Sequence, residues 1–194
     1  LPMPEMAYWE IFPLEGDLQV KILEPPVLPE PARNGDPGGT ECWTCSSPDR
    51  GVIWRDDRWH VRHFPSPTGL PAVITLYPNA HHDLEDLPDD LAAEFGLMLR
   101  RVSRAVQTLD GIARVHVNRW GDGSAHPHVW FLPRPLGMRQ MRGTCLAIWD
   151  DLLPPMPEDE WLDNLRRISA ALAADGGTAF EPTPPAADPP TTPG

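Results

Sequence analysis

The chain has 194 residues, a length that suits one domain with additional tails. Its formal net charge of −12 argues against binding to a nucleic-acid backbone or to an anionic membrane surface. No apolar run is long enough to span a bilayer, no charged-then-apolar signal segment opens the chain, and three cysteines do not make a disulfide scaffold. The composition therefore predicts a cytoplasmic protein.

The distribution of proline and glycine predicts how the chain is divided. Residues 1–40 are expected to form a proline-rich N-terminal extension and linker. Within them, residues 8–12 could form a strap that docks on the body or on a second subunit, and residues 18–22 alternate like an edge strand. Residues 41–175 form the predicted domain. Residues 176–194 consist mainly of proline, threonine, alanine and glycine, which predicts a disordered tail.

Hydrophobic periodicity predicts the elements of the domain. In chain order they are strands at 51–55, 59–64 and 71–77, a long helix opened by Pro88, strands at 112–118 and 126–133, and a helix opened by Pro157. Strands joined by hairpins, with helices to one side, indicate an α+β fold. The predicted architecture is an antiparallel sheet with helices packed on one side.

The segment His126-Pro127-His128 carries the strongest chemical signal in the chain. On a strand, the period of two places both imidazoles on the same face. The preceding loop of small residues, 121–124, can bring backbone N–H groups to the same place. A nucleophile beside an anion-binding loop is the minimum requirement for phosphoryl or nucleotidyl transfer. The alternative is a half-buried histidine pair next to a simple hairpin turn.

Cys42 and Cys45 have the spacing of half a zinc site. There is no second Cys-x-x-Cys, so histidines or carboxylates must complete such a site. The candidates are His126 and one of His81 and His82, and Pro78, three residues ahead of His81, favours His81. The alternative is an exposed turn with two free thiols.

The features occur in a characteristic order: Cys42-x-x-Cys45, a strand, Pro78-Asn79-Ala80-His81-His82, a long helix, a strand ending at Asn118, a glycine loop and His126-Pro127-His128. This order, over about residues 41–135, resembles the histidine-triad (HIT) superfamily of nucleotidyl hydrolases and transferases. The His-Pro-His triplet is most similar to the galactose-1-phosphate uridylyltransferase branch. The resemblance implies a sheet with helices on one side, a homodimer, and a structural zinc whose fourth ligand is His126.

The resemblance also implies that His128 is the nucleophile, which would attack an α-phosphate and form a nucleotidyl-histidine. Its other ring nitrogen should then donate to a backbone carbonyl. Trp130 stands where the ordinary triad has its third histidine, and an indole N–H can only donate. We therefore assign Trp130 to substrate binding and expect a substrate with a good leaving group.

The remaining residues implied to bind substrate surround the phosphate. Gly121, Gly123 and Ser124 would hold the phosphate oxygens with N–H groups and a hydroxyl, and Asn118 would help to hold the phosphate or the ribose. The loop between Asn118 and His126 is shorter than is usual in the family.

The expected function is cleavage or transfer of a nucleotidyl group from a nucleoside polyphosphate, dinucleoside polyphosphate, nucleotide phosphoramidate or nucleotide sugar. The alternative is a non-catalytic, zinc-stabilised binding module in which Trp130 marks a lost triad. The space around His128 discriminates between them. An open cleft favours the enzyme, and a ring buried under Trp130 or Trp120 favours the module.

Overall fold

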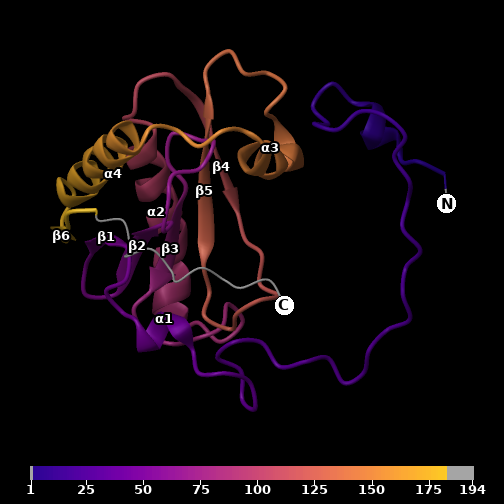
Figure 1. The fold of residues 1–194 in the computed structure, drawn as a ribbon. Helices are drawn as coiled ribbons and strands as arrows, with labels where there is room; N and C mark the ends of the chain where they lie inside the picture. Colours follow the sequence, from indigo (N-terminus) through magenta and orange to yellow (C-terminus); the bar gives the residue numbers. More distant parts are fainter. Residues whose placement is uncertain (1, 183–194) are drawn as a thin grey trace.

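The computed structural model describes residues 2–182, which form a six-stranded sheet with helices on both of its faces (Figure 1). The strand order is β4-β5-β3-β2-β1-β6, and every neighbouring pair is antiparallel. The strands are β1 Val52–Arg55, β2 Trp59–His63, β3 Ile74–Pro78, β4 Ile112–Asn118, β5 Val129–Pro135 and β6 Thr178–Ala179. The predicted α+β class and antiparallel sheet are confirmed.

The helical elements are η1 Glu5–Tyr8, α1 Trp43–Ser46, α2 Asp89–Val106, η2 Gly143–Cys145, α3 Leu146–Leu152 and α4 Glu158–Ala173. The two long helices, α2 and α4, begin directly after Pro88 and Pro157, and each has acidic residues in its first turn. Proline fixes the backbone for helix entry, and the acids favour the positive end of the helix dipole. No helix among the described residues is long and apolar enough to cross a bilayer.

The two faces of the sheet bury different apolar clusters. Helices α2 and α4 pack against the face that carries Val61, Ile74 and Phe131, as predicted. Helix α3 instead contributes to a smaller cluster with Val73 and Leu132, which project from the opposite face. Helix α3 covers only one end of this second face. We call it the pocket face, because the uncovered part holds a cavity that is described below. The prediction that helices lie on one side therefore holds for α2 and α4 but not for α3.

Strand β5 begins at Val129, so His126 and His128 lie in the extended segment just before it. The sequence predicted that the strand would begin at His126. Pro127 between the histidines has no N–H to donate to a ladder, which accounts for the later start.

The predicted edge strand at residues 18–22 is absent: this segment is extended, has no strand partner among the described residues, and leaves Ile22 90% exposed. Residues 8–12 do dock on the body of their own chain. The Trp149 indole donates to the Ile11 carbonyl at 3.0 Å, and Arg142 lies 3.6 Å from Glu10. The strap therefore lies beside α3 (Figure 1).

The start of the predicted disordered tail needs correction. Residues 176–182 belong to the folded body, where β6 pairs with β1. The Trp54 indole donates to the Gly176 carbonyl at 3.0 Å, and the Phe180 N–H donates to the Ile53 carbonyl at 2.8 Å. Long-range pairing of this kind leaves no local sequence pattern. Residues 183–194 of the predicted tail lie outside the described residues.

Candidate functional site

Four potential metal ligands meet where α1 approaches the segment before β5. The ligand atoms of Cys42, Cys45, His81 and His126 all lie within 4.8 Å of one another. His126 Nδ1 is 3.5 Å from each of the two sulfur atoms, and His81 Nδ1 is 3.6 Å from Cys45 Sγ. The sequence left His81 and His82 open, and the structure brings His81 into the cluster.

Backbone contacts orient the cluster. His126 Nε2 lies 2.9 Å from the Pro78 carbonyl, which can only accept, so Nε2 carries the proton and Nδ1 presents a lone pair to the sulfurs. Gly35 has a φ of +87°, and a Cβ there would lie 2.8 Å from His81 Cε1. A residue with a side chain at position 35 would therefore press on the His81 ring.

The cluster fits a tetrahedral zinc ion. With Zn–S of about 2.3 Å and Zn–N of about 2.0 Å, the S···N edges of the tetrahedron are about 3.5 Å, close to the separations seen here. Burial lowers the pKa of His126 to about 4, which keeps its imidazole neutral as a ligand must be. Partial burial and the neighbouring Cys42 raise the pKa of Cys45, an effect that a divalent cation would reverse by stabilising thiolates.

His128 is half-buried and belongs to the wall of a cavity, not to the cluster. Its Nδ1 lies 3.0 Å from the His126 carbonyl oxygen, as the sequence led us to expect. Because that oxygen can only accept, Nδ1 carries the proton and Nε2 keeps its lone pair. The ring has the tautomer that a nucleophile needs.

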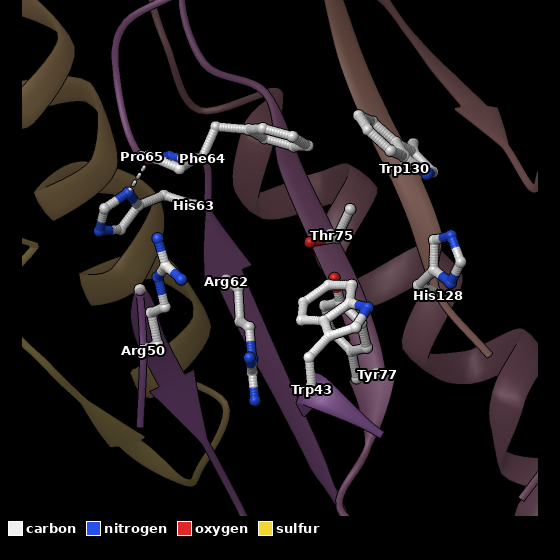
Figure 2. A pocket seen from close by; sticks show the side chains of 11 residues that line it. Trp43, Arg50, Arg62, His63, Phe64, Pro65, Thr75, Tyr77, His128 and Trp130 are labelled. Carbon is white, nitrogen blue, oxygen red and sulfur yellow. Dashed lines mark hydrogen bonds between the residues drawn. The ribbon is translucent and has the colours of Figure 1, made fainter. Parts of the chain in front are cut away.

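The cavity has a volume of about 370 Å³ and lies on the pocket face (Figure 2). The strand register determines which side chains line it. Arg62, Thr75 and Trp130 are successive partners across β2, β3 and β5. In the next row, Tyr77 stacks against the His128 ring at a centroid distance of 6.0 Å. Together these side chains form the floor of the cavity, which runs from His128 to the buried Arg62.

The glycine loop is tied to the segment that follows the N-terminal linker. Arg33 donates to the Gly121 carbonyl at 3.1 Å, and the Asn34 N–H donates to the Gly123 carbonyl at 3.2 Å. The Ser124 hydroxyl accepts from the His126 N–H at 3.2 Å. These contacts hold the loop in place but use its carbonyls and its hydroxyl.

The structure brings together only part of the predicted substrate site. His128 and Trp130 line the cavity, whereas Asn118, Gly121, Gly123 and Ser124 are not among its lining residues. Asn118 is the cross-strand partner of Trp130. The phosphate-binding roles of these four residues stay predictions.

Sequence reasoning missed Arg62 and Tyr77, the two largest polar side chains of the cavity floor. The available signal was the alternation in β2 and β3, which points Arg62 and Tyr77 to the same face. Alternation does not tell which face of the sheet carries the cavity, because that depends on long-range strand pairing. It therefore could not assign Arg62 and Tyr77 to a site.

Comparisons with known proteins give structural similarity alone. No protein-family model and no curated protein matches the chain. Among similar solved structures, a zinc-bound histidine triad family protein from Mycobacterium smegmatis is 20% identical, covering 68% of this chain and 94% of its own, with a TM-score of 0.49. A Hit-like protein involved in cell-cycle regulation from Bartonella henselae is 14% identical (67% and 93% covered, TM-score 0.49). A hypothetical histidine triad nucleotide-binding protein from Sulfolobus tokodaii is 15% identical (69% and 93%, TM-score 0.49). At such identities, function must be inferred from the residues of this chain.

The buried His60 generates a prediction about stability and pH. Burial lowers the pKa of His60 to about 3, although its Nδ1 bonds to Asn79 Oδ1 at 2.9 Å. An unfolded histidine takes up its proton near pH ~6.5, so between these values the unfolded state binds more protons and stability falls as pH falls. The slope from this one group is about 1.4 kcal/mol per pH unit.

We expect His60→Gln to reduce the loss of unfolding free energy between pH 6.5 and pH 5 by about 2 kcal/mol, measured by urea denaturation in the presence of a chelator. His82→Gln is the control, because His82 lies outside the cluster and the cavity wall. If the free energy of unfolding depends on pH equally in His60→Gln and in the unmodified chain, His60 is not the source of that dependence.

Proposed function

We propose that this chain is a nucleotide hydrolase or nucleotidyltransferase of the histidine-triad type that acts through His128. The observation that carries the proposal is the hydrogen bond from His128 Nδ1 to the His126 carbonyl in a ring that also lines the cavity. In the neutral ring, that bond places the lone pair on Nε2, where a substrate has room to enter.

In the proposed reaction, His128 Nε2 attacks the α-phosphorus of a nucleotide. A P–N bond forms as the P–O bond to the leaving group breaks, and the leaving group departs with the electron pair. Water or another acceptor then attacks phosphorus, which breaks the P–N bond and restores the imidazole. The candidate substrates are nucleoside polyphosphates, dinucleoside polyphosphates, nucleotide phosphoramidates and nucleotide sugars, and all four classes are tested.

Trp130 limits the choice of substrate. Its ring lies 6.4 Å from that of His128, between centroids, and an indole can donate a hydrogen bond but cannot deliver a proton to a leaving group. Substrates whose leaving group is a nucleotide or pyrophosphate need least protonation. Such substrates suit this site best.

The alternative is a binding module without chemistry. It requires a His128 ring closed off by Trp130 or Trp120. Instead, Trp120 packs edge-on against Trp130 at 5.6 Å between centroids, and His128 remains in the wall of the cavity. This arrangement favours the enzyme.

The metal proposed for the cluster is a structural zinc ion. Two thiols and two imidazoles fill the four positions of a tetrahedron, so no position is left for a reactive water. The metal would join α1, the segment before α2 and the segment before β5. Its contribution is therefore to folding and to the position of His126.

We expect elemental analysis of protein purified without added metal to find about one zinc per chain. Cys42→Ser should lower both the zinc content and the melting temperature, because structural metal binding is coupled to folding. Cys145→Ser is the matched control, since Cys145 is also buried but lies outside the cluster. His81→Gln should lose zinc and His82→Gln should keep it. The proposal fails if no zinc is found, or if both histidine variants retain it.

We expect His128→Gly to reduce turnover by more than about 10³-fold while fold and zinc content persist, because it removes the nucleophile and not a ligand. Added imidazole should restore part of the activity. The assay uses a panel of nucleoside polyphosphates, dinucleoside polyphosphates, nucleotide phosphoramidates and nucleotide sugars, with intact-mass detection of a nucleotidyl adduct.

His116→Gln serves as the control, because His116 is a half-buried histidine on β4 outside the cavity wall. Full activity in His128→Gly would refute the nucleophile assignment. An unmodified chain that turns over no nucleotide of the panel would favour the binding module.

We further propose that the chain forms a homodimer, as the resemblance implies. The sequence predicts an interface through the long helix α2 or the strand before it, β3. Strand β3 is paired on both edges, so it offers no free sheet edge to a second chain. Two exposed surfaces remain: the unpaired edge of β4, where Val117 is 41% exposed, and the outer face of α2, where Leu97 is 64% exposed. An unpaired edge strand is a ready template for pairing with a second chain.

Light scattering at micromolar concentration should give twice the 21.6 kDa chain mass. Val117→Lys should produce monomers if β4 forms the interface, and Leu97→Lys should do so if α2 forms it. Both side chains are exposed, so neither change disturbs the core. A monomeric unmodified chain would contradict the dimer.

A further inference from the structure

The cavity contains a buried cation that the proposed reaction does not use. Arg62 is 4% exposed, and within residues 2–182 no carboxylate lies within 4.0 Å of its guanidinium. The neighbouring Asp49 is paired with Arg55 at 2.7 Å. Burying a charge without a partner costs free energy, so its position calls for a compensating group.

Hydrogen bonds from one nitrogen hold this guanidinium in the part of the chain that the structure describes. Nη2 donates to the carbonyls of Thr44 and Pro48 at 3.0 and 3.2 Å. Nε is buried without an acceptor in the described part of the chain. The Cζ atom lies 5.2 Å from the centre of the Tyr77 ring. Arg62 is thus held in place with donor capacity left over.

The rest of the cavity wall also offers positive charge and hydrogen-bond donors. Among residues 2–182, the lining includes a second arginine, Arg50, and no aspartate or glutamate, although the whole chain carries a net charge of −12. The indole Nε1 of Trp130 is also buried without an acceptor in the described residues. Two unpaired donors and two cations in one cavity fit a ligand that brings oxygen acceptors and negative charge.

The Tyr77 ring limits how far this cation lies from the nucleophile candidate. Arg62 Cζ lies 5.2 Å from the centre of the Tyr77 ring and the centre of the His128 ring lies 6.0 Å from it, so the two groups are at most about 11 Å apart. The Tyr77 ring occupies the space between, stacked on His128 and lying under Arg62 (Figure 2). A ligand that reaches both ends must place a flat or narrow group over Tyr77.

We propose that Arg62 binds a second anionic group of the substrate, a carboxylate or a phosphate, on the other side of Tyr77 from the phosphorus that His128 attacks. This inference rests on the proposed function for the position of that phosphorus. The substrate class is therefore a nucleotide-type phosphoester with a further oxyanion at its far end. A neutral base or sugar would leave the arginine uncompensated.

Isothermal titration calorimetry with aryl phosphates tests the proposal, because their ring separates a phosphate from a second group. The probes are phenyl phosphate, 4-carbamoylphenyl phosphate, 4-carboxyphenyl phosphate and 1,4-phenylene bisphosphate. We expect at least one of the two probes with an anionic far end, the carboxylate or the second phosphate, to bind at least about tenfold more tightly than the carbamoyl probe, whose far end is neutral, as a charge-assisted contact requires. The tighter of the two identifies carboxylate or phosphate as the preferred group.

This preference should disappear in Arg62→Met and persist in Arg104→Met, which removes an exposed arginine of α2. Arg62→Gln, which can still bond to the loop carbonyls, should lose the preference too and guards against misfolding of the methionine variant. Titrations are repeated in His128→Asn, where retention of the preference shows that the anion site exists whether or not His128 is a nucleophile.

The inference is overturned if the unmodified chain binds the carbamoyl and the anionic probes equally. It is also overturned if the preference survives in a folded Arg62→Met or Arg62→Gln. A lower melting temperature together with an intact preference would make Arg62 a structural residue that holds the 44–48 loop.

Discussion

Two backbone carbonyls determine the chemistry of the His126-Pro127-His128 segment. The Pro78 carbonyl fixes the proton of His126 on Nε2, and the His126 carbonyl fixes the proton of His128 on Nδ1. Opposite tautomers follow for two chemically identical side chains, one presenting Nδ1 to two sulfurs and the other keeping Nε2 unprotonated. The division of the pair into ligand and nucleophile candidate depends on these two hydrogen bonds.

The register of the sheet extends the site beyond that segment. Because β3 lies between β2 and β5, its Tyr77 connects the row that ends at His128 with the row that contains Arg62. Helices α2 and α4 cover the opposite face, and α3 covers only one end of this one. The part of the face left uncovered holds the cavity, and its positive lining contrasts with the acidic chain.

Local signals predicted the elements well and the contacts poorly. Proline entry and apolar periodicity placed α2 and α4, and ligand type and spacing placed Cys42, Cys45 and His126 in one cluster. The position of Pro78 also favoured His81 over His82, and His81 is the histidine found in the cluster. The approach of Gly35 to the His81 ring depends on how distant segments meet, which no local pattern encodes. The same holds for β6, whose pairing with β1 joins residues more than a hundred positions apart.

The cluster and the nucleophile candidate are mechanically connected through one residue. His126 offers its imidazole to the two cysteines and its carbonyl to the His128 ring. A zinc ion that holds the imidazole would therefore hold the carbonyl as well, with Pro127 restricting the backbone between them. If the cluster holds a metal and His128 is the nucleophile, the metal would take no part in bond making, yet it would help to fix which nitrogen of His128 carries the lone pair.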